Sequence, residues 1–336
     1  MKKKFFAIAA VLALLSCAAS GGVPEARNLT APRLEYAARA FARGLEASGA
    51  KSGAMCVVID GKTVFQKVFS CPEDEKFQLG NTSQALLSLM LASMESAGAV
   101  RADWKVSRHC SFLSEKYSGA FADFLSMRAG VDPHADDLLP RASSAAETFE
   151  AASQIQPISG AGGVQIRSRL SAALAGYALG YVFDKREKNM KKSFAACSEK
   201  YLFKPLKFSD PRFASYSGAL FPATAYALSI GDTAKWLECE TSPNPPIATR
   251  ETLAQRRFPK SPEEKFANGW MRSSERGAVF FVAADSFENR ANVCAVFPSA
   301  NAAAAFFAHS PDAAKSAKLC ADSMSKIVEM LTTPAQ

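Results

Sequence analysis

The segment from Phe77 to Gln84 carries the polar side chains best placed for chemistry, because an apolar helical pattern follows it directly. It reads Phe-Gln-Leu-Gly-Asn-Thr-Ser-Gln. Side chains three residues apart at a helix start lie on one face, so Asn81 and Gln84 are expected to point the same way. Acyl transfer from such a pair needs a nucleophilic oxygen beside a group that accepts its proton. Neither carboxamide supplies these functions.

The same pair also fits a purely structural interpretation. Asn is a favoured helix N-cap, and Gln three residues later can bond back to the N–H of the cap. Asn81 and Gln84 therefore predict a capping box at the start of a helix. Ser83 is the nearest hydroxyl, but the residue three positions after it is Leu86, which is no base.

The apolar patterns place this segment between two groups of strands. Residues 33–47 predict an amphipathic helix, and the Asp60-Gly61 turn predicts a hairpin of strands 54–59 and 63–69. Further strands are expected at 278–283, 291–297 and 302–307, followed by a closing helix at 313–331. Between the two groups of strands, helices are expected at 82–97, 121–127, 170–183 and 231–237. Strands from both chain ends predict one sheet, with the terminal helices on one face and the helical insertion on the other.

This order resembles the fold of serine β-lactamases and penicillin-recognising enzymes, and is closest to class C-like members, including D-alanyl-D-alanine peptidases and related esterases. The family pattern Phe-x-Ile/Leu-Gly-Ser-x-x-Lys has Asn81 here in place of the serine and Gln84 in place of the lysine. The stretches at 53–62, 94–103, 201–206 and 230–237 also resemble family segments. The resemblance implies an α+β fold. It has a five-stranded antiparallel sheet subdomain (33–76 and 262–336) and an inserted all-α subdomain (77–261).

Two further family motifs are also changed. The Tyr-x-Asn motif aligns with Arg167-Ser168-Arg169, and the Lys/His-Thr/Ser-Gly strand aligns with Phe281–Asp285, which has neither the cation nor the glycine. Loss of a nucleophile or its base typically costs ~10⁶ in turnover. The resemblance therefore implies a family fold without catalytic residues, metal or cofactor. The alternative is an active serine hydrolase, an esterase, peptidase or β-lactamase relative, with Ser83 as a relocated nucleophile.

Two arginines of the degenerate site suggest one kind of ligand. Arg167 and Arg169 could bind a carboxylate or phosphate, such as the end of a peptidoglycan fragment, or could point to solvent. A non-catalytic protein of this kind would be a binding or scaffold protein, with a peptidoglycan fragment or an envelope protein as its partner.

The first residues predict export. Lys2 to Lys4 precede the apolar run Phe5–Leu15, and Cys17 follows. A basic start, a short apolar core and small residues are typical of a signal peptide, and the run is shorter than the ~20 residues that span a bilayer. Cys17 resembles a lipid-attachment cysteine, which predicts a signal over 1–17 and a linker over 18–32. The alternative is an ordinary signal cut near Ala19. No Asp follows the cysteine, so the periplasmic face of the outer membrane is expected in a diderm.

The charge and the cysteine pattern argue against a nucleic-acid partner and a metal site. The net charge of +8 falls to +5 without the three signal lysines, and no basic run is interleaved with aromatics, so a nucleic-acid partner is not expected. The most basic cluster, 185–192, fits a solvated helix face or a contact with an anionic surface. Seven cysteines remain besides Cys17, none in a C-x-x-C pair. An odd number leaves one unpaired, and we expect mostly free, buried thiols and no metal site.

Overall fold

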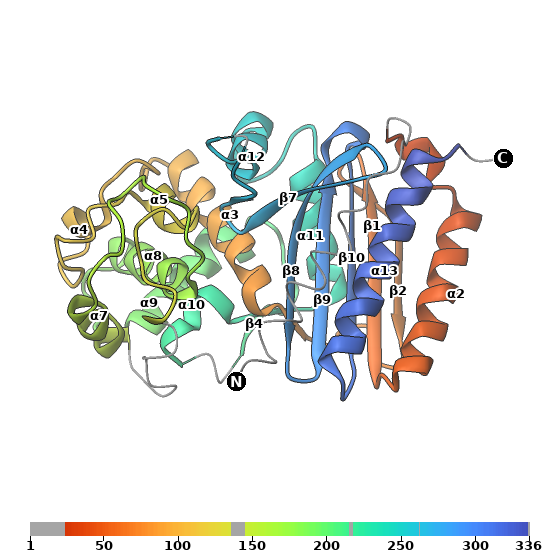
Figure 1. Cartoon of the computed structure of the whole chain (residues 1–336), viewed down its shortest axis with the longest axis horizontal. Helices are drawn as coiled ribbons and strands as arrows, with labels where there is room; N and C mark the ends of the chain where they lie inside the picture. Colours follow the sequence, from red (N-terminus) through yellow and green to blue (C-terminus); the bar gives the residue numbers. More distant parts are fainter. Residues whose placement is uncertain (1–23, 136–144, 215–217, 262, 335–336) are drawn as a thin grey trace.

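The computed structural model describes residues 24–135, 145–214, 218–261 and 263–334. Cys17 and the predicted signal segment lie outside these residues. The described chain forms an antiparallel sheet flanked by helices, with a helical part at its side (Figure 1). Within these ranges, no helix combines the length and the apolar composition that a membrane crossing needs.

The main sheet contains the five expected strands and two more. Its order is β2-β1-β10-β9-β8-β7-β6. The expected strands are β1 (Ser52–Ile59), β2 (Lys62–Phe69), β8 (Ala278–Phe287), β9 (Arg290–Phe297) and β10 (Ala302–His309). The additional strands are β6 (Phe266–Ala267) and β7 (Trp270–Glu275) at the edge beside β8. The apolar pattern missed them because β6 has two residues, while β7 is mostly polar and only its two end residues are buried.

The first hairpin forms as its turn residues predict. Asp60 and Gly61 both have positive φ, 50° and 71°. Two left-handed residues between strands match the right-handed twist of a hairpin, and Asp-Gly tolerates them. β1 then pairs on its other side with β10, with Ser52 opposite His309, so strands from the two chain ends lie side by side.

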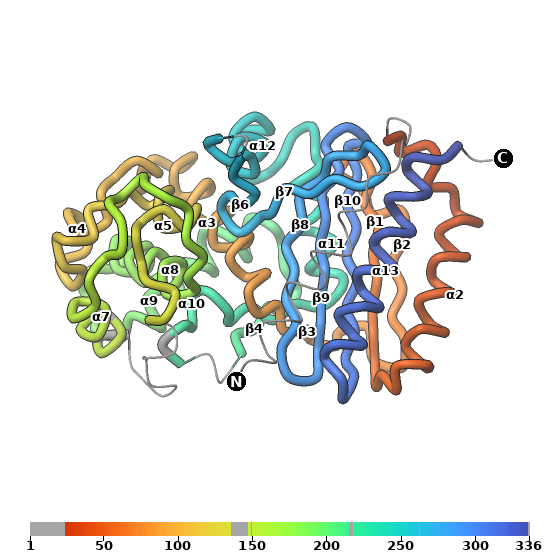
Figure 2. The backbone as a smooth tube through the Cα atoms, viewed as in Figure 1, coloured from red at the N-terminus to blue at the C-terminus, as the bar shows by residue number. Residues whose placement is uncertain are grey.

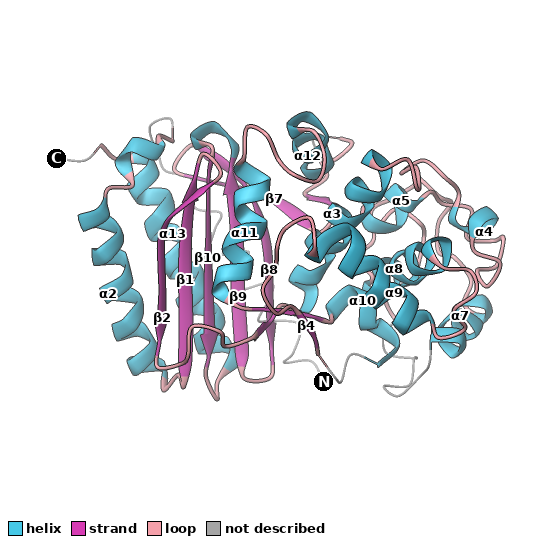
Figure 3. Ribbon diagram, turned by 180° about the vertical axis from the view of Figure 1, so that it is seen from behind, coloured by secondary structure: helices cyan, strands magenta, loops and turns pink. Residues whose placement is uncertain are grey.

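Helices cover both faces of the sheet. α2 (Ala31–Ser48) and α13 (Ala313–Thr332) pack on one face, and α11 (Ile230–Thr241) packs on the other (Figures 1 and 3). Successive β1 side chains alternate between these layers: Met55 joins the core under α2 and α13, and Cys56 joins the core under α11. The sheet is therefore buried on both faces, which explains the nearly continuous apolar runs of its central strands.

The helical part is built around α3 (Ser83–Ser96), which lies between the sheet and the other helices (Figure 2). A helix that is apolar on every side is a buried helix, and α3 is buried from its first residue through Met94. Around it lie α4 (Val106–His109), α5 (Phe121–Leu125), α7 (Ala145–Gln154), α8 (Arg169–Phe183), α9 (Met190–Ser198), α10 (Phe221–Thr224) and α12 (Arg250–Arg257). A small sheet of β3 (Phe77–Gln78), β5 (Tyr226–Leu228) and β4 (Arg212–Phe213) closes its base. Short 3₁₀ turns and the π-helical turn η3 (Glu199–Phe203) complete it.

Candidate functional site

The start of α3 is held against strand β8. Asn81 lies in the 3₁₀ turn η2 (Gly80–Thr82), and its Nδ2 donates to Oδ1 of Asp285 at 2.6 Å. Gly80 has φ +54°, and a Cβ at this position would lie 1.9 Å from Oδ2 of Asp285. Glycine therefore allows both the backbone conformation and the close approach of the carboxylate. The result is a carboxylate packed directly on the turn that precedes the helix.

This geometry corrects the predicted capping box. The N-cap of α3 is Thr82 rather than Asn81, and no side chain caps the helix. The 3₁₀ turn runs into α3 with helical backbone angles, so the extended N-cap conformation that a capping box needs is absent at Thr82. Asn81 gives its amide hydrogen to Asp285 instead. Gln84 is buried and lines a small pocket beside Asn81.

Burial controls the charge of Asp285. Only 7 % of the residue is exposed, and this burial raises the pKa of Asp285 to about 6, because a charged carboxylate is poorly solvated there. Hydrogen bonds from Asn81 and the attraction of Arg169 oppose the increase. Arg167 also interacts electrostatically with Asp285. Each of the two predicted anion-binding arginines is thus already attracted to a carboxylate that belongs to the chain itself.

A second polar pair joins the same turn to strand β9. Thr82 Oγ1 donates to Oδ1 of Asn292 at 2.6 Å, and Nδ2 of Asn292 donates to the carbonyl of Leu79 at 3.1 Å. Asn292 is the cross-strand partner of Asp285. Because both side chains are buried, each unpaired polar group would cost ~1–3 kcal/mol, so the pairs fix the turn on the sheet.

Ser83 faces the small sheet. The residue is fully buried, and its Oγ accepts a hydrogen bond from the backbone N–H of Tyr226 in β5 at 3.2 Å. Leu86, one turn further along α3, is also fully buried. The hydroxyl is therefore separated from Asn81 and Gln84 by the helix and has an apolar neighbour where a base would be needed.

The pocket beside Asn81 is small. It has a volume of about 20 Å³ and is lined by Asn81, Gln84, Arg167, Phe266, Gly269, Met271, Val282 and Ala284. Such a volume holds about one water molecule, which needs ~10–15 Å³ of accessible space. The buried Oδ1 of Asn81 has no hydrogen-bond partner among the described residues and offers an acceptor to that water.

Arg167 forms the outer side of this pocket. Its guanidinium carbon lies 5.3 Å from the centroid of the Phe266 ring, and part of the residue remains exposed. Protein atoms around the guanidinium lower the pKa of Arg167 from its ordinary value, and the attraction of Asp285 opposes this. Arg169 begins α8, after Ser168. Three of the predicted site residues, Asn81, Gln84 and Arg167, thus line one pocket. Arg169 interacts with Asp285, which is bonded to Asn81. Ser83 does not line the pocket.

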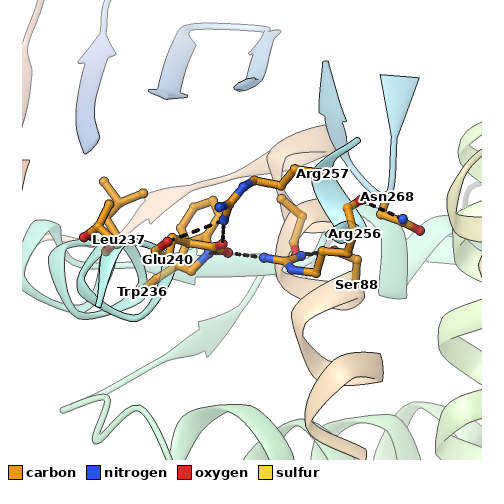
Figure 4. Close-up of polar contacts among 9 residues, drawn as sticks. Ser88, Trp236, Leu237, Glu240, Arg256, Arg257 and Asn268 are labelled. Carbon is orange, nitrogen blue, oxygen red and sulfur yellow. Dashed lines mark hydrogen bonds and ion pairs between the residues drawn. The ribbon is translucent and has the colours of Figure 1, made fainter. Parts of the chain in front are cut away.

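A buried ion cluster also contacts α3 (Figure 4). The carboxylate of Glu240 in α11 accepts from Arg256 and, at 2.5 Å, from Arg257 in α12. Arg256 also donates to Ser88 and, at 3.2 Å, to the carbonyl of Ala85, both in the first turns of α3. The cluster thus fixes the position of the helix that directly follows Asn81.

Three residues that shape the site were missed by the sequence analysis. Asp285 interrupts the apolar residues of β8 and Asn292 those of β9, and a polar residue inside such a run was the available signal. Gly269 was the least visible. Its φ is +85°, and a Cβ there would lie 2.2 Å from the backbone nitrogen of Ala85, so the turn between β6 and β7 packs on α3 backbone to backbone.

Among the described residues, no group of His, Cys, Asp or Glu is arranged to hold a metal ion. All seven described cysteines are free thiols, and all but Cys71 are buried. Burial raises the pKa of Cys56 to about 12, so this thiol stays protonated and unreactive at neutral pH.

The comparisons with known proteins agree with this geometry. A solved penicillin-binding protein homologue from Pyrococcus abyssi is 11 % identical, with 88 % of this chain and 77 % of that chain covered and a TM-score of 0.72. A class C beta-lactamase from Rhodobacter sphaeroides is 16 % identical, with 87 % and 98 % covered and a TM-score of 0.68. A D-stereospecific amidohydrolase from Streptomyces sp. is 14 % identical, with the same coverages and a TM-score of 0.63.

At these identities the structures establish a shared fold alone. Comparison with curated protein sequences finds no match. The model of the Beta-lactamase family matches residues 37–329, which includes both the sheet and the helical part. The chain therefore belongs to the Beta-lactamase family and has its serine-hydrolase fold.

Proposed function

We propose that this chain is a non-catalytic member of its family that acts as a binding or scaffold protein in the cell envelope. The observation that carries the proposal is the hydrogen bond from Asn81 to the buried carboxylate of Asp285. Asn81 lies directly before α3, at the position where the family pattern has its nucleophilic serine. A carboxamide has no hydroxyl that a neighbouring base could turn into the nucleophile of acyl transfer, so the carboxylate beside it has no nucleophile to activate.

The space at this position supports the same conclusion. A pocket of about 20 Å³ is far below the ~300 Å³ at which small-molecule sites begin. A β-lactam or peptide substrate would need β7, β8 and the start of α3 to separate. Gly269 packs on the backbone of Ala85, and Gly80 packs on Asp285, so separation would break buried contacts on both sides.

The competing proposal is an active serine hydrolase that uses Ser83. It would require the first turn of α3 to rotate, because the Ser83 hydroxyl is buried and bonded to the N–H of Tyr226. We expect this rotation to be unfavourable, since it would leave that buried N–H without an acceptor, at a cost of ~1–3 kcal/mol.

Lipid attachment at Cys17 is part of the proposal. The basic start, the apolar run and the small residues around Cys17 support it. Several acyl chains on one cysteine would anchor the protein firmly, because each buried CH₂ contributes ~0.8 kcal/mol. The absence of Asp after Cys17 supports the periplasmic face of the outer membrane in a diderm.

The proposed partner is an envelope protein or a peptidoglycan fragment. Arg167 offers an exposed cation beside the pocket. The small volume favours a partner that binds across this surface over a peptide that enters it. Titration calorimetry with a D-Ala-D-Ala-terminated peptide tests the peptidoglycan form. Binding that is lost in Arg167→Ala supports a peptidoglycan partner. If the folded protein gives no heat with the peptide, the peptidoglycan form is refuted and an envelope protein is the remaining partner.

Covalent labelling tests the central claim. The folded protein is incubated with a fluorophosphonate and, separately, with a fluorescent penicillin, and its intact mass is measured. We expect no adduct with either reagent. A single adduct that disappears in Ser83→Ala would establish the hydrolase instead. A second sample, unfolded before labelling, controls for nonspecific reaction.

A further inference from the structure

The helical part contains a groove that shares no lining residue with the pocket at Asn81. It lies where α9 and the π-helical turn η3 approach the segment that leads into β4. Its volume of about 730 Å³ falls within the ~300–1,000 Å³ typical of small-molecule sites. The lining includes Ala195, Ala196, Phe203, Lys204, Lys207 and Phe213. The groove thus combines aromatic and cationic side chains.

Aromatic rings form the apolar part of the groove. Phe203 is buried, and its ring centroid lies 5.8 Å from that of Phe208 and 5.6 Å from that of Phe213. Phe208 and Phe213 are half-buried and both line the groove, so they supply its accessible apolar surface. Burying aromatic surface against a ligand contributes ~25 cal/mol per Å². An apolar chain or ring would therefore gain free energy there.

A strongly basic segment of the chain, residues 184–207, supplies part of the lining of the groove. Residues 184–207 carry eight basic and three acidic side chains, a formal charge of +5. This equals the charge of the whole chain after the signal lysines are removed, so the rest of the chain is neutral overall. Lys204 and Lys207 are exposed and line the groove, and Lys192 lies one helical turn before Ala195 and Ala196 on α9.

The acidic groups of the groove are already compensated. Glu199 lies 3.8 Å from Lys204. Asp210 lies 2.9 Å from Arg212 and 3.5 Å from Lys76. Glu199 is already counted in the charge of +5, and the cations that pair with Asp210 lie outside the segment 184–207, so the cationic excess of this segment remains to attract an anion from solution.

We propose that this groove binds an anionic amphiphile, with a phosphate or carboxylate head at Lys204 and Lys207 and an acyl or aromatic part against Phe208 and Phe213. A bilayer lipid or a soluble acyl phosphate could supply this chemistry. The proposal stands independently of the non-catalytic assignment, because it uses none of the residues at Asn81.

Titration calorimetry with octyl phosphate below its micelle concentration tests the groove. Inorganic phosphate supplies the head alone, and octyl glucoside supplies the same tail with an uncharged head. We expect octyl phosphate to bind at one site and at least about tenfold more tightly than either probe. If inorganic phosphate binds as tightly as octyl phosphate, the proposed apolar contact with Phe208 and Phe213 is refuted. If octyl phosphate gives no heat, the site itself is refuted.

Matched charge variants separate a site from diffuse attraction. Lys204→Ala/Lys207→Ala removes two charges inside the groove, and Lys185→Ala/Lys188→Ala removes two from the same basic segment outside its lining. We expect a loss of about tenfold or more in the first variant and less than about twofold in the second. Equal losses would overturn the proposal. Phe208→Ala, checked for an unchanged melting temperature, is expected to weaken octyl phosphate and leave inorganic phosphate unchanged.

Vesicles identify the source of the ligand. The protein without residues 1–17 is sedimented with phosphatidylglycerol vesicles and with phosphatidylcholine vesicles. Sedimentation with the anionic vesicles alone, lost in Lys204→Ala/Lys207→Ala, supports a bilayer lipid in the groove. Octyl phosphate binding without sedimentation supports a soluble acyl phosphate.

Discussion

Asp285→Asn should change how the stability of the protein depends on pH. The substitution keeps the size of the side chain and an oxygen that accepts from Asn81, but it removes the ionisable group. In the wild type, burial raises the pKa of Asp285 to about 6 from an ordinary value of 3.8. The folded chain therefore retains this proton at a pH where the unfolded chain has lost it. The free energy of unfolding must then decrease as the pH rises from about 4 to about 6.

The size of the effect follows from the two pKa values. A difference of about two between them corresponds to about 3 kcal/mol, at 1.36 kcal/mol for each tenfold change. Because Asn does not ionise, the variant lacks this decrease. The difference in unfolding free energy, variant minus wild type, should increase by up to ~3 kcal/mol between pH 4 and pH 7. Urea unfolding at closely spaced pH values measures it, and shared titrations cancel in the difference.

Asp103→Asn provides a control of opposite sign. Asp103 is exposed, and its hydrogen bond with Arg101 lowers the pKa of Asp103. The stabilisation by this group develops below about pH 4, between its lowered folded pKa and its unfolded value of 3.8, so its variant should lose stability relative to the wild type there and show little further change from pH 4 to pH 7. If the Asp285→Asn difference stays constant within ~0.5 kcal/mol from pH 4 to pH 7, burial does not displace the proton of Asp285. The proposed electrostatics at the start of α3 would then be wrong.

Three further substitutions test the packing and the anchor. Gly269→Ala should lower the free energy of unfolding by at least ~3 kcal/mol in urea, because the added Cβ would clash with the backbone of Ala85. Gly49→Ala is the control: this glycine also has a positive φ, +67°, but lies in open space, so its variant should lose only ~1 kcal/mol. Glu240→Gln should cost ~3–5 kcal/mol in thermal or urea unfolding, since it leaves two buried arginines without a counter-charge; a loss below ~1 kcal/mol would contradict this. Cys17→Ala should move the protein from the membrane fraction to the soluble fraction, and retention in the membrane would refute lipid anchoring.

Local patterns were sufficient for most of the architecture. The expected helix at 33–47 corresponds to α2, and its predicted apolar face, from Leu34 through Leu45, is buried. The Asp60-Gly61 turn and the closing helix at 313–331 are also confirmed. These elements could be predicted because hydrophobic periodicity and turn chemistry act within a few residues.

The site could not be predicted as completely, because its geometry depends on contacts across the chain. Asn81 and Asp285 are 204 residues apart, and their hydrogen bond replaces the local capping interaction that the sequence predicted. Local propensity gives way when a buried partner offers a stronger interaction. The strand β7 was missed for a related reason: its sequence is mostly polar, and its position is set by pairing with the distant strand β8 rather than by a buried apolar pattern of its own.

The free cysteines have a consequence for how such a protein must mature. Six of the seven described thiols are sealed inside the folded molecule, beyond the reach of oxidants, and only Cys71 has partial exposure. In an oxidising compartment these sulfurs can be cross-linked only while the chain is still open. If the chain is exported as we propose, rapid folding after export would protect these thiols, whereas slow folding would leave them open to mismatched disulfide bonds.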